Sequence, residues 1–209
     1  NENKSIGFYE IAKIKFDSDI KDAHKNILKA LELKKNFAPY IKLHLEIIVN
    51  LKDKRNLKKL IKKYWSLSPS SLLRSIIIKI LDDNNLTHIK FINEIIKNNA
   101  SEEESKKLLI YFAIKNLKWD IARENINGMI GSNPSKDVCY FMSDIELGEN
   151  NDKQKSDAWI MRAENGKLEE TWICRITNQP QEEWSSLSSS GNYNSLVWSS
   201  PMMIRQNIN

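Results

Sequence analysis

Apolar residues recur along positions 1–165 at steps of three and four, the spacing that places side chains on one face of an α-helix. The segments are separated by turn residues, by N-capping residues such as Asp19, and by Pro39, which suits the first turn of a helix. The pattern predicts five antiparallel helix pairs. They are Ile6–Phe16 with Asp19–Leu33, Tyr40–Leu51 with Leu57–Trp65, Ser71–Leu81 with Thr87–Lys97, Glu102–Asn116 with Trp119–Ile130, and Lys136–Leu147 with Asp152–Ala163.

The same apolar positions return at a longer, regular interval. One set of matching positions is Ala23, Ile27, Ala30 and Leu31, which correspond to Leu57, Ile61, Tyr64 and Trp65. This second set and the following Pro69 recur almost two intervals later, as Ala122, Ile126, Met129, Ile130 and Pro134. The interval is about 34 residues, the length of one tetratricopeptide helix–turn–helix unit. Such units bury their apolar faces by stacking on their neighbours. The predicted fold class is therefore all-α, a tetratricopeptide-like α-solenoid of about five helix pairs over residues 1–165.

The pattern changes after Gly166. Thr171–Ile176 and Ser195–Trp198 are short β-prone runs. Trp172, Trp184 and Trp198 lie close together in this part of the chain, which is more apolar bulk than a flexible linker carries. We therefore expect a small packed module at 166–200, followed by a loose tail at 201–209.

The net charge of +5 is unevenly distributed. Residues 1–100 hold 20 Lys/Arg against 11 Asp/Glu (+9), whereas residues 101–209 hold 12 against 16 (−4). The basic residues are densest at 52–63, where Leu57, Leu60 and Ile61 alternate with them at helical spacing. This run is best interpreted as the solvated back of an amphipathic helix. An anionic membrane surface or a nucleic acid is an alternative partner, although no arginine-aromatic cluster, RNA-recognition signature or zinc finger favours nucleic acid.

The sequence carries no motif that predicts catalysis. A Gly-rich phosphate loop, a His-Glu-x-x-His helix and a Gly-x-Ser-x-Gly elbow are all missing, so we expect a non-catalytic protein. Glu102–Glu104 suit the first turn of a helix. Cys139 lies on an apolar face with Val138 and Phe141, which indicates a buried thiol rather than a nucleophile. The two cysteines are too few for a disulfide framework and favour a reducing compartment.

Several motifs, taken in order, resemble a known family. They are Asn36-Phe-Ala-Pro39, Lys63-Tyr-Trp65 with Pro69, Trp119-Asp-Ile-Ala-Arg123, Cys139–Leu147, Trp159–Ala163, Trp172-Ile-Cys174, Trp184, Gly191 and Leu196-Val-Trp198. Together they make residues 36–198 similar to the C-terminal part of the HemY-type proteins of proteobacteria. These are membrane-anchored tetratricopeptide proteins associated with heme biosynthesis.

The resemblance implies a protein-interaction scaffold of heme or tetrapyrrole biosynthesis, with enzymes of that process as partners. It also implies two transmembrane helices upstream of Asn1 and a repeat domain on the cytoplasmic side of the bacterial inner membrane. In family members the tail resembles a zinc ribbon with two Cys-x-x-Cys pairs. Here only Cys174 remains, while Thr177 and Ser188–Ser190 occupy the other positions, so we expect no metal, no cofactor and a core made by the tryptophans.

In tetratricopeptide arrays the first helix of each pair lines the concave face, where partners bind. The register assigns seven residues to this partner-binding groove: Lys15, Lys42, Glu46, Asn50, Lys107, Tyr111 and Lys115. Lysine and asparagine there can hold a peptide carboxylate through charge-assisted hydrogen bonds. Three alternatives stay open: direct hand-over of heme or porphyrin through His44 or Cys174 as an axial ligand, a generic soluble adaptor, and a helical solenoid that binds nucleic acid.

Overall fold

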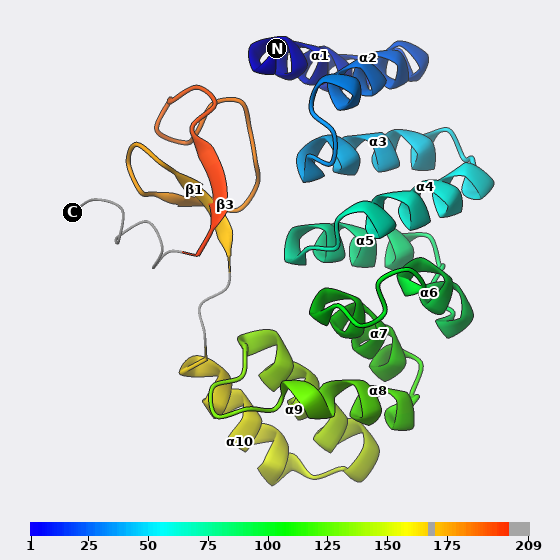
Figure 1. Cartoon of the computed structure of the whole chain (residues 1–209), viewed down its shortest axis with the longest axis vertical. Helices are drawn as coiled ribbons and strands as arrows, with labels where there is room; N and C mark the ends of the chain where they lie inside the picture. Colours follow the sequence, from blue (N-terminus) through cyan, green and yellow to red (C-terminus); the bar gives the residue numbers. More distant parts are fainter. Residues whose placement is uncertain (167–169, 201–209) are drawn as a thin grey trace. The chain divides into compact units, whose positions relative to one another are not determined.

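The computed structural model describes residues 1–166 and 170–200, so the predicted loose tail at 201–209 lies outside the described residues. The chain divides into two compact units, Asn1–Leu108 and Leu109–Asn209. Ten α-helices and a three-stranded sheet form within the described residues (Figure 1). None of the helices formed by these residues is both long enough and apolar enough to span a bilayer.

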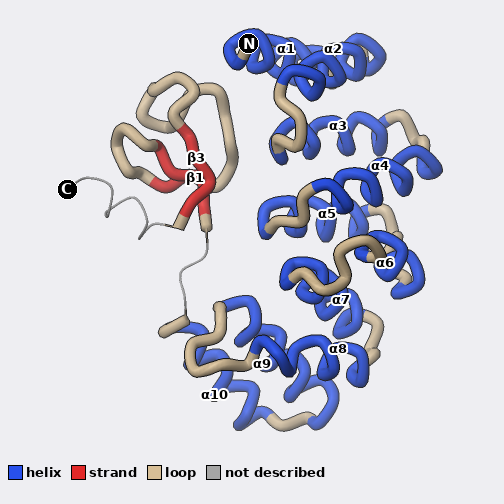
Figure 2. The backbone as a smooth tube through the Cα atoms, viewed as in Figure 1, coloured by secondary structure: helices blue, strands red, loops and turns tan. Residues whose placement is uncertain are grey.

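The first unit consists of stacked helix pairs (Figure 2). Its helices are α1 (Glu2–Lys15), α2 (Ile20–Leu33), α3 (Ala38–Asn50), α4 (Lys54–Leu67), α5 (Ser71–Asp83), α6 (Ile89–Ile96) and the first residues of α7 (Glu103–Lys115). Within the pairs, α1 packs on α2 and α3 on α4. Between pairs, α2 packs on α3, α3 on α5 and α4 on α6, so each pair rests on the next.

The repeat interval of the sequence reappears in the buried side chains. Helix α2 buries Ala23, Ile27 and Ala30 completely. On α4, Leu57 corresponds to Ala23 and Ile61 to Ile27, and both are equally buried. Trp65 is fully buried as well, and its indole N–H donates a hydrogen bond of 2.9 Å to Ser105 Oγ on α7. The period predicted from the sequence is therefore the period of the core.

Several helices begin at a short polar side chain that caps them. Asp19 and Asp53, which hold equivalent positions in successive pairs, accept the backbone N–H of Asp22 and Asn56 at 3.0 Å, and Ser70 caps α5 in the same way. The turn within each later pair contains a residue of left-handed backbone conformation: Lys52, Asn85, Leu117 and Asn151, with φ between 51° and 58°. The pairs thus share one turn geometry as well as one core register.

The second unit continues the pairs. It contains the rest of α7, α8 (Trp119–Ile126), a 3-10 turn (Asn127–Met129), α9 (Lys136–Asn150) and α10 (Lys153–Glu164). Helices α9 and α10 form a hairpin, and α8 packs against α9 at Gly148, where an added Cβ would lie 2.4 Å from the Trp119 ring. The helix predicted as Trp119–Ile130 is shorter than expected, because its last residues form the 3-10 turn.

Three short antiparallel strands follow, in the order β2-β1-β3. They are β1 (Thr171–Cys174), β2 (Pro180–Gln181) and β3 (Leu196–Ser199). Trp172 and Trp184 are buried, and the rings of Trp172 and Trp198 meet edge to face at 5.4 Å, so the tryptophans do supply core. The predicted fold class, tetratricopeptide-like helix pairs with a small β appendage, is confirmed.

Candidate partner-binding site on the first helices

A cavity of about 270 Å³ opens in the first unit, at the C-terminal ends of α1, α3 and α5. Its lining residues are Phe16, Glu46, Val49, Asn50, Lys79, Ile80, Asp83 and Asn84. Phe16, Asn50 and Asn84 are separated from one another by one repeat interval, and each lies at the end of its helix. Three of the eight lining residues therefore come from one repeat position.

The walls of this cavity are mainly apolar, and its charges are mainly negative. Phe16, Val49 and Ile80 provide apolar surface, whereas Glu46 and Asp83 bring two carboxylates against the single ammonium of Lys79. The C-terminal end of a helix also carries about half a negative elementary charge. A ligand with an apolar stem and a positive head suits this combination.

Two of the seven predicted groove residues, Glu46 and Asn50, line the cavity. Lys15 and Lys42 are half-buried on α1 and α3 and lie outside its lining. Lys107 is only 5% exposed, and its Nζ lies 2.7 Å from Glu103 Oε1. Its charge is compensated within α7, which makes it unsuited to the predicted role of holding a peptide carboxylate.

The other two predicted groove residues belong to the second unit. Tyr111 is half-buried with its ring edge-on to Phe112 at 5.0 Å, and Lys115 is exposed in the last turn of α7. The seven residues thus do not meet in one cavity of the first unit. Sequence reasoning missed the other six lining residues, although the step of one repeat from the predicted Asn50 leads directly to Phe16 and Asn84.

A chain of polar side chains crosses α2, α3 and α4, with His24 half-buried and His44 and Tyr64 buried. His24 Nε2 lies 3.2 Å from His44 Nε2, and His44 Nδ1 lies 2.6 Å from the Tyr64 hydroxyl. Burial, followed by the charges of His24 and Lys63, lowers the pKa of His44 to about 4, so this imidazole is neutral at pH 7. Burial raises the pKa of Tyr64 to about 12. His44, one of the two residues considered as a heme ligand, therefore has both ring nitrogens engaged.

The two thiols differ in their surroundings. Cys139 is fully buried and desolvation raises its pKa, which confirms the predicted core thiol. Cys174 is 1% exposed, and hydrogen bonds from Ser195 and Thr177 lower its pKa to about 6. Its Sγ lies 3.3 Å from Ser195 Oγ. Within 1–166 and 170–200, no group of three or more His, Cys, Asp or Glu side chains is arranged to hold a metal ion.

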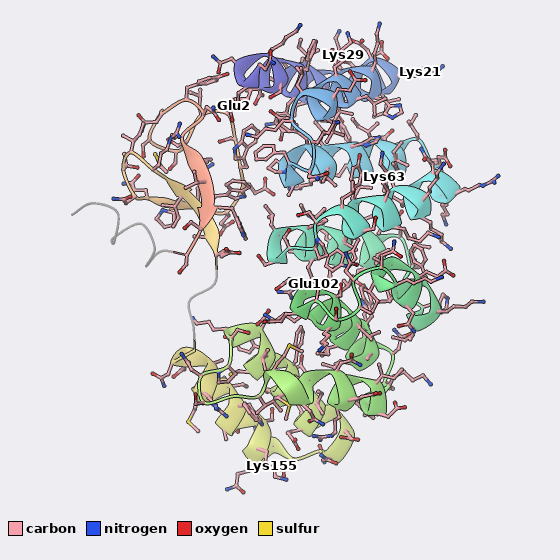
Figure 3. The ribbon with its side chains drawn as sticks, in the orientation of Figure 1. Glu2, Lys21, Lys29, Lys63, Glu102 and Lys155 are labelled. Carbon is pink, nitrogen blue, oxygen red and sulfur yellow. The ribbon has the colours of Figure 1, made fainter. Side chains whose placement is uncertain are left out.

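The basic run at 52–63 forms the outer face of α4. Six of its seven charged side chains are exposed, among them Lys63, which projects from α4 in Figure 3. Lys62 pairs with Glu94 of α6 at 3.3 Å, and Lys58 lies over the Phe91 ring at 5.1 Å. The interpretation as the solvated back of an amphipathic helix is confirmed.

No family model and no curated protein matches this chain. Among solved structures, it is similar to MamA 41-end from Desulfovibrio magneticus RS-1, with a TM-score of 0.43 and 12% identity over 78% of this chain and 96% of that chain. The MamA RS-1 ArsTM double mutant gives 0.43 and 11% identity over 78% and 93%. A further MamA crystal structure gives 0.39 and 13% identity over 73% and 91%. These values describe a distant likeness of backbone alone.

Proposed function

We propose that this chain is a non-catalytic scaffold that binds an extended segment of a partner protein along the first helices of its first unit. A lysine or arginine side chain of that segment enters the cavity at the ends of α1, α3 and α5. The observation that carries the proposal is the pairing of apolar walls with Glu46 and Asp83 in one repeat-built cavity.

The size and chemistry of the cavity favour a single side chain as its occupant. At about 270 Å³ it is smaller than the pockets of roughly 300–1,000 Å³ that enclose drug-sized ligands. Lysine and arginine bury their methylene stems on apolar surface and keep the charged head near polar groups. Phe16, Val49 and Ile80 suit the stem, and the two carboxylates suit the head.

The sequence-based prediction favours the opposite charge, a peptide carboxylate held by Lys42 and Asn50. A random peptide library, displayed on phage and selected on the full chain, separates the two. We expect selected peptides to share a lysine or arginine next to apolar residues. Glu46→Lys and Asp83→Lys should abolish this enrichment, whereas Glu32→Lys, an exposed position on α2, should leave it intact.

Two outcomes would contradict the proposal. If the selected peptides are acidic and lose binding in Lys42→Glu, the carboxylate prediction is right and the cavity is not the site. If no peptide is selected above the background of an unrelated helical protein, the chain is not a peptide-binding scaffold under these conditions of display.

The resemblance to HemY-type proteins supports a narrower form of the proposal. In this form the scaffold serves heme or tetrapyrrole biosynthesis at the cytoplasmic side of a bacterial inner membrane and binds enzymes of that process. Calorimetry with purified enzymes of tetrapyrrole synthesis tests it. Binding that is lost in Asp83→Lys would support it, and the absence of binding to every enzyme would refute the narrower form while leaving peptide binding intact.

Direct hand-over of heme is the weaker candidate. Its two proposed axial ligands, His44 and Cys174, are 3% and 1% exposed, so a group as large as a heme cannot reach either of them without opening the core. We therefore expect no shift of the Soret band when hemin is titrated into the protein. A shift that disappears in His44→Gln would restore this function.

A further inference from the structure

We propose that His24 and His44 form a binding site for a late first-row divalent metal ion such as Zn²⁺, with Tyr64 orienting His44. The site joins α2 to α3 and lies apart from the cavity lining. It is independent of the proposed peptide binding, so either can be right without the other.

The separation of the two nitrogens matches a chelated ion. Imidazole nitrogens bind tetrahedral zinc at roughly 2.0–2.1 Å, which places two such ligands about 3.3 Å apart. His24 Nε2 and His44 Nε2 are 3.2 Å apart, and their rings lie within 26° of parallel. His24 is half-buried, so its ring has room to turn towards an ion held by His44.

The protons can be arranged to free both lone pairs. Without metal, one Nε2 must carry a hydrogen that it donates to the other, because two bare nitrogens at this distance repel each other. With metal, His44 carries its proton on Nδ1 and donates it to the Tyr64 oxygen, 2.6 Å away. Metal binding moves one proton from Nε2 to Nδ1 of whichever histidine was the donor, and it releases none. Histidine ligands typically donate their second ring N–H in this way, which fixes the tautomer.

Burial prepares His44 for this role, and one charge opposes it. His44 is 3% exposed, and its hydrogen bond to the Tyr64 hydroxyl holds the ring in place. Lys63 of α4 is close enough to lower the pKa of His44, so its ammonium also weakens the attraction for a cation. His24 is partly exposed, and water from that side completes the coordination.

Titration of Zn²⁺ alone into the full chain tests the site. Cys174→Ser serves as the parent, so that this thiol does not compete for zinc. We expect His24→Gln and His44→Gln each to weaken binding at least about 10-fold, and Tyr64→Phe to weaken it about 10- to 100-fold. The matched control is His88→Gln, since His88 is exposed at the start of α6 and should not contribute.

A second measurement covers the case in which a variant fails to fold. In NMR spectra of the unmutated chain, Zn²⁺ should shift the imidazole signals of His24 and His44 and leave those of His88 unchanged. The proposal is overturned if these signals do not move, or if folded His24→Gln binds Zn²⁺ as tightly as its parent.

Discussion

At the scale of single residues, some buried polar groups find hydrogen-bond partners that lie far away in the sequence. The Trp65 indole reaches Ser105 on a helix of a later pair, and the Ser5 hydroxyl lies 3.1 Å from the Tyr40 hydroxyl. Such pairs are costly to break from one side, because the remaining group stays buried without its hydrogen bond. They therefore fix which helix lies against which.

We predict that Ser105→Ala lowers the free energy of unfolding by about 1–3 kcal/mol, because it leaves the Trp65 N–H buried and unpaired. Urea denaturation measures the change. Ser66→Ala is the control: its hydroxyl bonds the Lys63 carbonyl at an exposed position, so the loss should stay within about 0.5 kcal/mol. Equal losses in the free energy of unfolding would show that the buried hydrogen bond stabilises the protein no more than the exposed one.

The pair of Arg123 and Glu146 predicts a dependence on pH. Desolvation alone would raise the pKa of Glu146, but hydrogen bonds from Arg123 and Asn150 and the Arg123 charge outweigh it, so the pKa is lowered. The lowered pKa stabilises the folded protein at pH values above 4.5, the ordinary pKa of a glutamate. This stabilisation is lost as the pH falls below 4.5 and Glu146 becomes protonated. Arg123→Met should therefore cost about 1–3 kcal/mol at pH 7 and less at pH 3. A cost that does not shrink on acidification would contradict the assignment.

At the scale of elements, close approach of helices determines which glycines are required. Replacing a mid-helix glycine by alanine normally stabilises by about 0.5–1 kcal/mol. At Gly148 of α9 the added carbon would lie 2.4 Å from the Trp119 ring, and this clash reverses the sign. We predict that Gly148→Ala destabilises the protein by about 1–3 kcal/mol in thermal or urea unfolding. Gly7→Ala on α1, where nothing lies within 4 Å, should be neutral or stabilising.

The left-handed turn within the helix pairs predicts a substitution that stabilises the protein. Leu117 has φ 56° and is 69% exposed, so its side chain gains little from packing while its backbone is strained. Leu117→Gly should stabilise the protein by about 1 kcal/mol, measured as a raised urea midpoint. Asn151→Gly at the equivalent turn should change little, because asparagine tolerates this conformation. A destabilised Leu117→Gly would mean that the leucine packs usefully after all.

At the scale of the whole molecule, the sequence predicts features that are local or periodic. The helix pairs and their buried positions follow from the helical step inside the longer repeat interval, both of which a single sequence displays. Glu104 lies in the first turn of α7, as predicted, but it also accepts a hydrogen bond of 2.7 Å from Arg74 of α5, a tertiary contact that no local pattern reveals. Strand β2 was missed because Pro180 and Gln181 carry no alternating apolar signal.

The candidate sites needed the packing of several helices to become visible. The cavity takes its lining from three helices, and no single segment contains enough of these residues to reveal it. The same holds for His24, His44 and Tyr64, whose even spacing has meaning only once α2, α3 and α4 lie side by side. Charge was misleading too, since a strongly basic half of the sequence encloses a cavity with more acidic than basic groups.

The bond between Trp65 and Ser105 passes from α4 to α7 and so skips the intervening pair, α5 and α6. Repeat arrays usually gain or lose whole units by duplication and deletion, since each unit contacts only its neighbours. Here the loss of α5 and α6 would leave the buried Trp65 N–H without its acceptor. A duplicated pair between α4 and α7 would move Ser105 out of hydrogen-bond distance. A change in the number of repeats in this stretch would therefore cost this buried hydrogen bond unless Trp65 or Ser105 were substituted as well.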